Sequence, residues 1–209
     1  VKMLDFDGTV FNGLWSVICL DAVLALMLKL DNLGEGDTLV LAGSIPSSMP
    51  DSIYSDIMAR LRDRGVTFVV AATKDLMLNV LEYNPFLIKP NHHELGEIFG
   101  VTLKEREDVI PYARQLQKKG ARNVLVSMGG KGAVLLDAGQ QVHMRPVPEG
   151  KLVNAVGSGD SMVAGFIAGW TEKKDYEHAF KMGIAAGSAS AFSELLATEE
   201  EIRTLYREL

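Results

Sequence analysis

A glycine-rich turn lies in Asn154-Ala155-Val156-Gly157-Ser158-Gly159-Asp160-Ser161, directly before the apolar, helix-like run 162–170. Backbone N–H groups in such a turn at a helix start form a concave set of donors for an anion. The positive end of the helix dipole points to the same place. Asp160 could accept a proton there from an attacking hydroxyl group, or it could simply be the N-cap of an ordinary strand–turn–helix corner. These residues alone leave both interpretations open.

Short apolar runs alternate with segments of helical periodicity over most of the chain. Asp51 is predicted to cap a helix in which Ile53 and Ile57 recur at helical spacing, and Gly65 is predicted to end it. Strands are predicted over 38–42, 66–70, 86–88, 123–127, 133–136 and 141–145, and helices over 75–81, 93–99, 107–119, twice after the glycine-rich turn, and from a capping box at 198–201 onward. This alternation predicts an α/β protein with a mostly parallel sheet covered on both faces.

Length and charge restrict the class of protein. The chain has 209 residues, of which 47% are apolar and 23% charged, values that fit one α/β domain with a substantial core. The net charge is −6, and no run of basic residues is longer than Lys118-Lys119 or Lys173-Lys174. These features argue against a nucleic-acid partner. An anionic substrate would have to be bound by local N–H groups, a few cations or a metal.

The first thirty residues differ in style from the rest. The apolar run 14–28 contains Asp21 near its middle and is short, which weighs against a transmembrane helix. No basic region precedes it, which weighs against a signal peptide. We therefore expect a buried helix in an atypical segment 1–30, and no membrane contact. The single cysteine, Cys19, fits a reducing, cytoplasmic location.

Four polar or glycine-rich stretches follow or adjoin predicted strands. They are Gly43-Ser44, 89–94, 127–132 and 157–160. Functional groups of parallel α/β sheets gather in the loops at the carboxyl ends of the strands. We therefore expect these stretches to share one edge of the sheet.

Together these stretches resemble the PfkB (ribokinase-like) family of carbohydrate kinases, most closely its bacterial 1-phosphofructokinase and tagatose-6-phosphate kinase branches. The resemblance covers about 31–208, includes the order of the motifs, and implies a ribokinase-like three-layer α/β/α sandwich with 31–209 as the kinase core. The stretch 154–160 matches the family's C-terminal signature, so the resemblance implies that the glycine turn is an anion hole and Asp160 the catalytic base. Asn154 stands where many ribokinase-like enzymes carry aspartate, whereas the phosphosugar branch often carries asparagine.

The resemblance implies transfer of the γ-phosphate of ATP, with Mg²⁺, to a hydroxyl of a phosphosugar. The first expectation is conversion of fructose 1-phosphate to fructose 1,6-bisphosphate, with a tagatose-6-phosphate kinase as the alternative; the resemblance is also compatible with a homodimer. The implied site residues are Asp160, Gly157, Ser158 and Gly159 for catalysis; Asn91, Ser127, Gly129, Gly130, Lys131, Gly132 and Gly159 for the nucleotide; Glu94 for the metal; and Ser44, Asn154 and Asp160 for the substrate.

Structural explanations stay open beside these roles. Asn91 and Glu94 also suit a helix N-terminus with an acidic first turn, and 127–132 also suits a β-turn. The small residues in 183–189 could contact adenine, but close helix packing is the better explanation. Glu94 would hold magnesium mainly through water, because Mg²⁺ keeps several of its waters.

The sequence also departs from the family pattern. Residues 1–30 resemble neither the sugar-binding Gly-Gly-Lys-Gly-type stretch nor the small β-sheet lid of these kinases, so the residues for the substrate's own phosphate cannot be assigned. Ala71 stands at a strand end where related enzymes often carry an acidic residue. A nucleotide-binding core without a lid and without turnover is therefore an open alternative.

A rival enzyme class is suggested by Lys2-Met3-Leu4-Asp5-Phe6-Asp7-Gly8-Thr9-Val10. This stretch resembles the first motif of haloacid-dehalogenase-like phosphatases, in which the first aspartate is the nucleophile. Gly159-Asp160-Ser161 mimics the last acidic motif of that family, but a further aspartate expected after it is missing. Such a protein would release phosphate with a metal and without a nucleotide.

Overall fold

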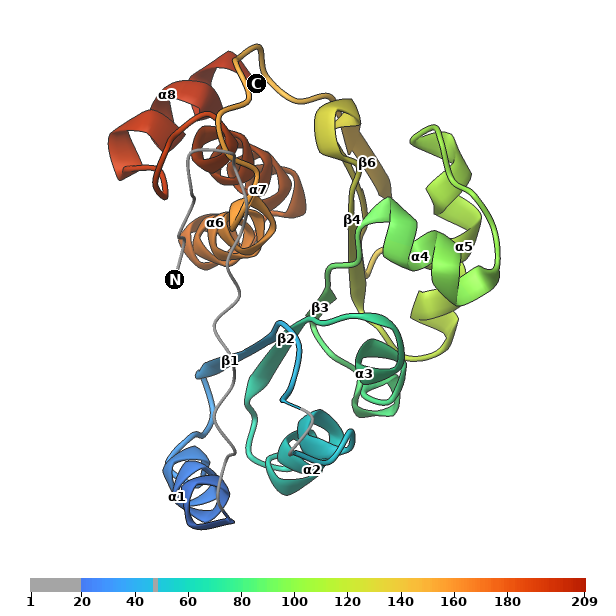
Figure 1. The fold of residues 1–209 in the computed structure, drawn as a ribbon, viewed down its shortest axis with the longest axis vertical. Helices are drawn as coiled ribbons and strands as arrows, with labels where there is room; N and C mark the ends of the chain where they lie inside the picture. Colours follow the sequence, from blue (N-terminus) through green and yellow to red (C-terminus); the bar gives the residue numbers. More distant parts are fainter. Residues whose placement is uncertain (1–19, 47–48) are drawn as a thin grey trace. The chain divides into compact units, whose positions relative to one another are not determined.

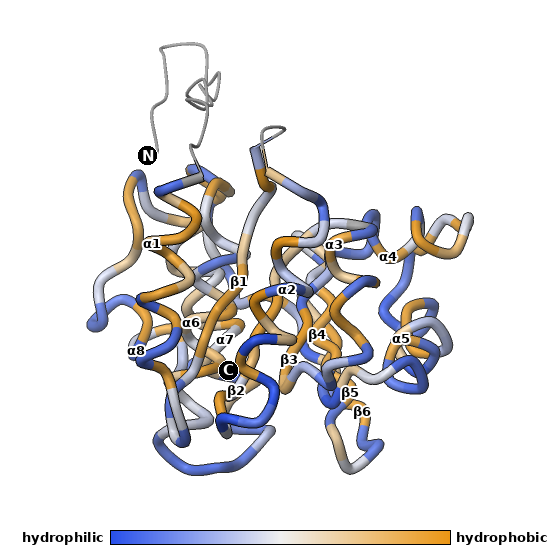
Figure 2. The backbone as a smooth tube through the Cα atoms, turned by 90° about the horizontal axis from the view of Figure 1, so that it is seen from below, coloured by the Kyte–Doolittle hydropathy of each residue, from blue (hydrophilic) through white to orange (hydrophobic). Residues whose placement is uncertain are grey.

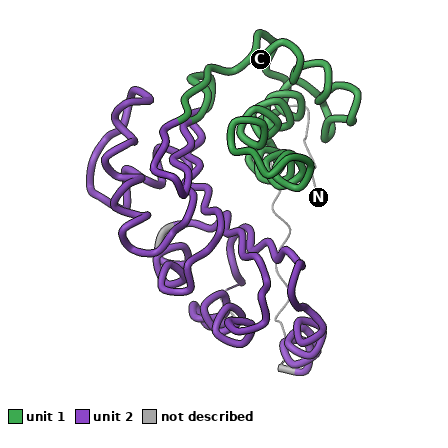
Figure 3. The backbone as a smooth tube through the Cα atoms, turned by 180° about the vertical axis from the view of Figure 1, so that it is seen from behind, with its two compact units in different colours: residues 1–14, 129–133, 143–209 green, residues 15–128, 134–142 purple. Residues whose placement is uncertain are grey.

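The computed structural model describes residues 20–46 and 49–209 (Figure 1). They form two compact units (Figure 3): unit 1 contains 129–133 and 143–209, and unit 2 contains the described residues up to 128 together with 134–142. The predictions for Cys19 and for the stretch 2–10 lie outside the described residues. None of the described helices combines the length and the apolar character that a membrane crossing requires.

Six strands form one sheet in the order β1-β2-β3-β4-β5-β6. The first four pair in parallel, which confirms the predicted α/β class with a mostly parallel sheet. Where the predicted bounds differ from those observed, they do so by one residue at an end. The strands are β1 (Thr38–Ala42), β2 (Thr67–Ala71), β3 (Leu87–Ile88), β4 (Asn123–Ser127), β5 (Ala133–Leu136) and β6 (Val142–Arg145).

The core of unit 2 lies between the sheet and its helices. Val124, Leu125 and Val126 of β4 have no exposed surface, as the near-continuous apolar sequence of a central parallel strand predicts. Figure 2 shows β3 and β4 as hydrophobic along their traces. The helices of unit 2 are α1 (Leu20–Leu30), α2 (Ile53–Arg60), α3 (Lys74–Leu78), α4 (His92–Phe99) and α5 (Ile110–Lys118), with 3₁₀ turns at Leu81–Tyr83 and Glu107–Val109.

Two details predicted for α2 are wrong, and the helix predicted over 75–81 is observed over Lys74–Leu78. Asp51 does not cap α2: the N-cap is Ser52, whose hydroxyl donates to the Asp56 carboxylate instead of accepting from the helix backbone. The helix ends at Arg60, because the chain then tightens into turns that run to Gly65, where φ is 73°. The predicted end at Gly65 is therefore the end of these turns.

The helix expected in the first apolar run is also not buried. In α1, Leu24 is 53% and Leu28 67% exposed, whereas Leu30 is buried. Val23 and Met27 pack against the core together with Leu30, so one narrow stripe of α1 faces the protein. Leu24, Leu26 and Leu28 lie outside this stripe and are exposed, which composition alone does not reveal.

Unit 1 is built on two helices that pack at very short distance, α6 (Ser158–Lys173) and α7 (Tyr176–Ala191). A Cβ atom at Gly165 would lie 2.6 Å from both the Met182 oxygen and the Ala186 Cβ, and one at Gly183 would lie 2.9 Å from the Met162 oxygen. Glycine at these positions therefore lets the two backbones approach each other. The packing explanation for the small residues of 183–189 is confirmed.

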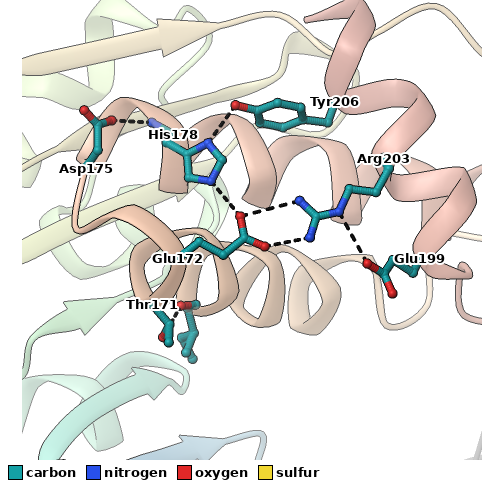
Figure 4. A network of polar contacts seen from close by, with 8 residues as sticks. Thr171, Glu172, Asp175, His178, Glu199, Arg203 and Tyr206 are labelled. Atoms are coloured by element: carbon teal, nitrogen blue, oxygen red, sulfur yellow. Dashed lines mark hydrogen bonds and ion pairs between the residues drawn. The ribbon is translucent and has the colours of Figure 1, made fainter.

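The far ends of α6 and α7 are joined to α8 (Glu199–Glu208) by a polar network (Figure 4). The Glu172 carboxylate contacts His178 Nε2 at 2.9 Å and a terminal guanidinium nitrogen of Arg203 at 2.6 Å. His178 Nδ1 lies 2.7 Å from the Tyr206 hydroxyl. A neutral imidazole satisfies both contacts by donating from Nε2 and accepting at Nδ1. The predicted capping box of α8, Thr198 with Glu201, is confirmed.

The Glu172 network predicts a pH dependence of stability. The hydrogen bonds from Arg203 and then His178 lower the pKa of Glu172 from 4.5 to about 2. A carboxylate with a lowered pKa stabilises the fold above its unfolded pKa, and this contribution is lost as the pH falls from 4.5 towards 2. We expect Glu172→Gln to lower the thermal midpoint at pH 7 and to lose less stability over that interval than the wild type.

The control is Glu199→Gln, since Glu199 is 82% exposed and contacts Arg203 only at 3.5 Å. Thermal unfolding monitored by circular dichroism at several pH values measures both variants. Parallel pH curves for wild type and Glu172→Gln would show that the network does not couple to folding.

Candidate active site

The glycine turn leads into α6 as predicted. Gly157 is the N-cap with φ at 80°, the helix begins at Ser158, and Asp160 lies in its first turn. A left-handed N-cap favours glycine because it carries no Cβ atom. The interpretation of Asp160 as the N-cap is therefore wrong, because Gly157 occupies that position.

The Asp160 carboxylate is exposed and has no hydrogen-bond or ion-pair partner among the described residues. Asp175, at the start of α7, behaves differently, since its carboxylate accepts the His178 N–H at 2.6 Å. A carboxylate at a helix start usually takes part in such a cap. Asp160 does not, and its oxygens are available to a ligand.

Two backbone donors beside Asp160 are also available. Within the part of the chain that the structure describes, the N–H groups of Gly159 and Asp160 have no acceptor. Ser158 differs from its predicted role, because its N–H and its hydroxyl both donate to the Ala155 oxygen, at 3.2 and 2.7 Å. The anion-binding capacity of the turn therefore lies with Gly159 and Asp160 at the positive end of the α6 dipole.

Asn154 supplies an unpaired donor in the same turn. Its side chain is 7% exposed, and its Oδ1 accepts the Val156 N–H at 3.0 Å. Its Nδ2 has no hydrogen-bond partner among the described residues. Buried polar groups are nearly always paired, so an unpaired amide here indicates a missing partner such as a ligand oxygen.

The end of α7 holds this turn in position. The Ala191 oxygen accepts the N–H groups of Val153 and Asn154, at 2.9 and 3.0 Å. The Ser190 hydroxyl donates to the Ser161 hydroxyl at 2.8 Å. No role is predicted for either serine from the sequence, because no local pattern pairs residues 29 positions apart. The place of Ser161 directly after Asp160 is a signal that could have indicated one.

In unit 2, Asn91, Glu94 and Ser127 come together at the carboxyl end of β4. Asn91 is the N-cap of α4, and Asn91 and Ser127 form an isolated parallel bridge. The Asn91 side chain accepts the Glu94 N–H at 2.8 Å, and Glu94 Oε2 accepts the Asn91 N–H at 2.8 Å. The structural explanation, a capped helix start, is therefore confirmed. The second carboxylate oxygen of Glu94 has no partner among the described residues.

The remaining predicted site residues lie in two loops. Gly129–Lys131 is a short 3₁₀ turn in unit 1, in which Gly129 has a φ of 56° and Gly132 one of 91°. A Cβ atom at Gly132 would collide with the Arg145 carbonyl, whereas one at Gly130 would meet no atom within 4 Å. Ser44 in unit 2 is exposed and follows Gly43, whose N–H donates to the Ala71 oxygen at 3.1 Å.

The acidic and other ligating side chains of the described residues indicate what kind of magnesium site the protein can form. The described residues contain no cluster of three or more His, Cys, Asp or Glu side chains that could cage a metal ion. Mg²⁺ is commonly held by one or two carboxylates together with waters and substrate phosphates. The free oxygen of Glu94 fits that kind of site.

Comparison with known proteins places this arrangement in a family. The sequence model described as "pfkB family carbohydrate kinase" matches residues 17–202. The chain belongs to the PfkB family.

Individual proteins with similar sequences are named as phosphosugar kinases. The chain is 44% identical over 209 residues to a 1-phosphofructokinase of Bacillus subtilis, covering 100% of this chain and 69% of the relative. It is 32% identical over 171 residues to a D-tagatose-1-phosphate kinase of Bacillus licheniformis, covering 81% of this chain and 56% of that protein.

A solved structure shows the same fold. The crystal structure of phosphofructokinase-2 from Escherichia coli in complex with substrates and products superimposes with a TM-score of 0.89 at 25% identity, covering 96% of this chain and 66% of that one. The ribokinase-like α/β fold is confirmed. The chain matches only part of the length of each relative.

The capping box of α4 allows the structural and metal roles of Glu94 to be separated. Glutamine can still accept the Asn91 N–H, so Glu94→Gln should keep the thermal midpoint close to the wild-type value. It removes the charge that would orient magnesium waters, so we expect a higher Mg²⁺ concentration for half-maximal rate. Titration of the kinase rate with Mg²⁺ measures this.

A matched control exists in the α8 capping box, where Glu201 has the same position relative to Thr198. Glu201→Gln should change neither the midpoint nor the magnesium requirement appreciably. If Glu94→Gln and Glu201→Gln have the same magnesium requirement, Glu94 is only a helix-capping residue.

Proposed function

We propose that this protein is an ATP-dependent phosphotransferase that phosphorylates a hydroxyl group of a phosphosugar, with fructose 1-phosphate as substrate and fructose 1,6-bisphosphate as product. One observation carries the proposal. The Asp160 carboxylate has no partner among the described residues and stands beside two unpaired N–H groups at the start of α6. A base next to an anion-binding turn is the arrangement that phosphoryl transfer to a hydroxyl requires.

In this reaction the sugar hydroxyl oxygen forms a bond to the γ-phosphorus while the bond from that phosphorus to the β–γ bridging oxygen breaks. Asp160 accepts the hydroxyl proton as the new bond forms. The N–H groups of Gly159 and Asp160 donate to the oxygens of the transferring group, whose charge is spread over these oxygens in the transition state.

The other candidate residues orient the two substrates. Gly129 and Gly130 leave open space around the loop, so a nucleotide can approach its backbone closely. The unpaired Asn154 amide would donate to a substrate oxygen, and Ser44 is a second candidate contact for the sugar. When bound, Mg²⁺ would neutralise phosphate charge, and the free oxygen of Glu94 would hold its waters.

A second candidate substrate is D-tagatose 1-phosphate, because a relative with 32% identity is named for it. Tagatose and fructose differ only in the configuration at C4. The groups that bind the transferring phosphate would therefore act in the same way with either sugar. Comparison of kcat/KM for fructose 1-phosphate, tagatose 1-phosphate and tagatose 6-phosphate with the full-length protein distinguishes them. Assembly into a homodimer, a cytoplasmic location and a division of the chain at residue 30 stay predictions.

The role of Asp160 is tested by Asp160→Asn. Asparagine keeps the size of the side chain, and Gly157 rather than Asp160 caps the helix, so the fold should survive. General-base contributions are on the order of 10²–10⁴-fold in rate. We expect kcat to fall at least about a hundredfold, with ATP affinity and thermal midpoint nearly unchanged.

Asp175→Asn is the matched control, since Asp175 also stands at a helix start of unit 1 but caps α7. Asparagine can cap a helix as well as aspartate, so this change should alter stability little and leave kcat close to the wild-type value. A near-normal kcat in Asp160→Asn would remove Asp160 as the base. No turnover by wild-type protein on any phosphosugar, with ATP still bound, would favour the nucleotide-binding module.

The placement of ATP at the 129–132 loop is tested by Gly130→Val. A side chain at Gly130 meets no protein atom within 4 Å, so the substitution fills only space that a ligand would need. We expect a clearly higher Kd for ATP by calorimetry, with little change in thermal midpoint. Gly34→Val is the control, because Gly34 has the same open surroundings in unit 2; equal ATP affinity in both variants would contradict the placement.

A further inference from the structure

A hollow of about 610 Å³ in unit 2 is lined by basic side chains. Arg114 and Lys118 lie one turn apart on α5, and Arg122 follows the end of that helix. The volume falls in the range of small-molecule sites. The basic hollow, as we call it, has the lining residues Arg114, Gln117, Lys118, Ala121, Arg122, Ala138 and Gln140.

The three cations of the basic hollow have no acidic partner. Among the described residues, neither Arg114 nor Lys118 nor Arg122 forms an ion pair. By contrast, arginines that form ion pairs in the described structure are neutralised within the protein, as Arg60 is by Asp31. In a chain with a net charge of −6, three adjacent unpaired cations create a local positive potential.

A chain of hydrogen bonds fixes one wall of the basic hollow. Arg114 donates to Gln140 Oε1 at 3.1 Å, and Gln140 Nε2 donates to Gln117 Oε1 at 3.0 Å. Gln117 Nε2 donates in turn to the backbone oxygens of Arg122 and Asp137, at 2.9 and 2.8 Å. Gln140 has a φ of 67°, which is uncommon for a residue other than glycine. The wall is therefore organised before any ligand binds, which reduces the cost of binding.

The Arg122 side chain contacts a buried aromatic residue of the core. The Arg122 guanidinium stands over the Phe86 ring, 5.6 Å from its centroid. The N–H donors of this guanidinium are not paired within the described residues. The edge of a guanidinium binds two oxygens of a phosphate or carboxylate at once.

The basic hollow is separate from the candidate active-site residues of unit 2. Arg122 directly precedes β4, whereas Ser127 ends that strand beside Asn91 and Glu94. Five residues of extended strand span roughly 13 Å or more. A ligand in the basic hollow would therefore lie at the opposite end of β4 from Asn91, Glu94 and Ser127.

Two features argue against the binding of an anion in the basic hollow. Asp137 lies in the adjacent turn, but its carboxylate accepts the Gln141 N–H at 3.0 Å and is buried. Lys118 lies in the last turn of α5, where a cation offsets the helix dipole without any ligand. That structural role explains one cation of the three and leaves both arginines unexplained.

We infer that the basic hollow binds a small polyanion, a molecule that carries at least two phosphate or carboxylate groups. Positions four residues apart on a helix are separated by about 6 Å of rise, so Arg114 and Lys118 face different parts of a ligand. Arg122 provides the third positive charge. A single phosphate would leave part of this charge unpaired, whereas two linked anionic groups match it.

The test uses inorganic pyrophosphate without magnesium and full-length, ¹⁵N-labelled protein. Shifts of the Gln117, Arg122 and Gln140 amides in NMR spectra report binding at the basic hollow, and the Gly159 amide reports the glycine turn separately. The triple variant Arg114→Gln/Lys118→Gln/Arg122→Gln should weaken pyrophosphate binding at the hollow at least tenfold. Inorganic phosphate should bind the wild type more weakly than pyrophosphate does.

The charge-matched control is Lys29→Gln/Arg62→Gln/Lys173→Gln, which removes three exposed cations elsewhere. Equal loss of binding in both triple variants would show that only net charge matters and would overturn the inference. So would the absence of amide shifts at the hollow in the wild type. A lower thermal midpoint of the first triple variant with unchanged pyrophosphate affinity would leave these residues a purely structural role.

Discussion

The close approach of α6 and α7 is the constraint on which the candidate chemistry depends. A side chain at Gly165 or Gly183 would collide with the facing helix, so only the small residues allow this distance. At the end of this helix pair where α6 begins and α7 ends, the Ala191 oxygen accepts hydrogen bonds from the segment before α6. The Ser190 hydroxyl donates to Ser161 in the first turn of α6. The turn is therefore fixed by helix packing, and its free donors need not be organised by the ligand.

In the proposed function, this fixed turn is the place where an acidic protein binds phosphate. The chain has a net charge of −6, yet the first turn of α6 presents unpaired N–H groups and the positive end of a helix dipole. Asp160 adds a negative charge at the same place. It can stay there because its carboxylate is exposed to water and makes no internal contact among the described residues. This combination suits a base that must accept a proton beside a phosphate.

Features contained in one stretch of sequence were predictable, and features made by distant residues were not. The glycine turn, the strand β4 and the capping box of α8 are each specified by neighbouring residues, and they occur where expected. The exposure of α1 depends on what packs against it, and the pairing of Ser161 with Ser190 joins separate helices. The basic hollow is not evident in the sequence because its cations are spaced four residues apart and form no consecutive basic run.

The central claim is that the N–H groups of Gly159 and Asp160 bind the transferring phosphate. A crystal structure of the full-length protein with ADP, fructose 1-phosphate and trifluoromagnesate, a planar mimic of the phosphoryl group, tests it most directly. The account predicts fluorine atoms within hydrogen-bond distance of both N–H groups and the attacking hydroxyl of the sugar beside the Asp160 carboxylate. A trifluoromagnesate group bound away from this turn, with Asp160 facing solvent, would contradict it.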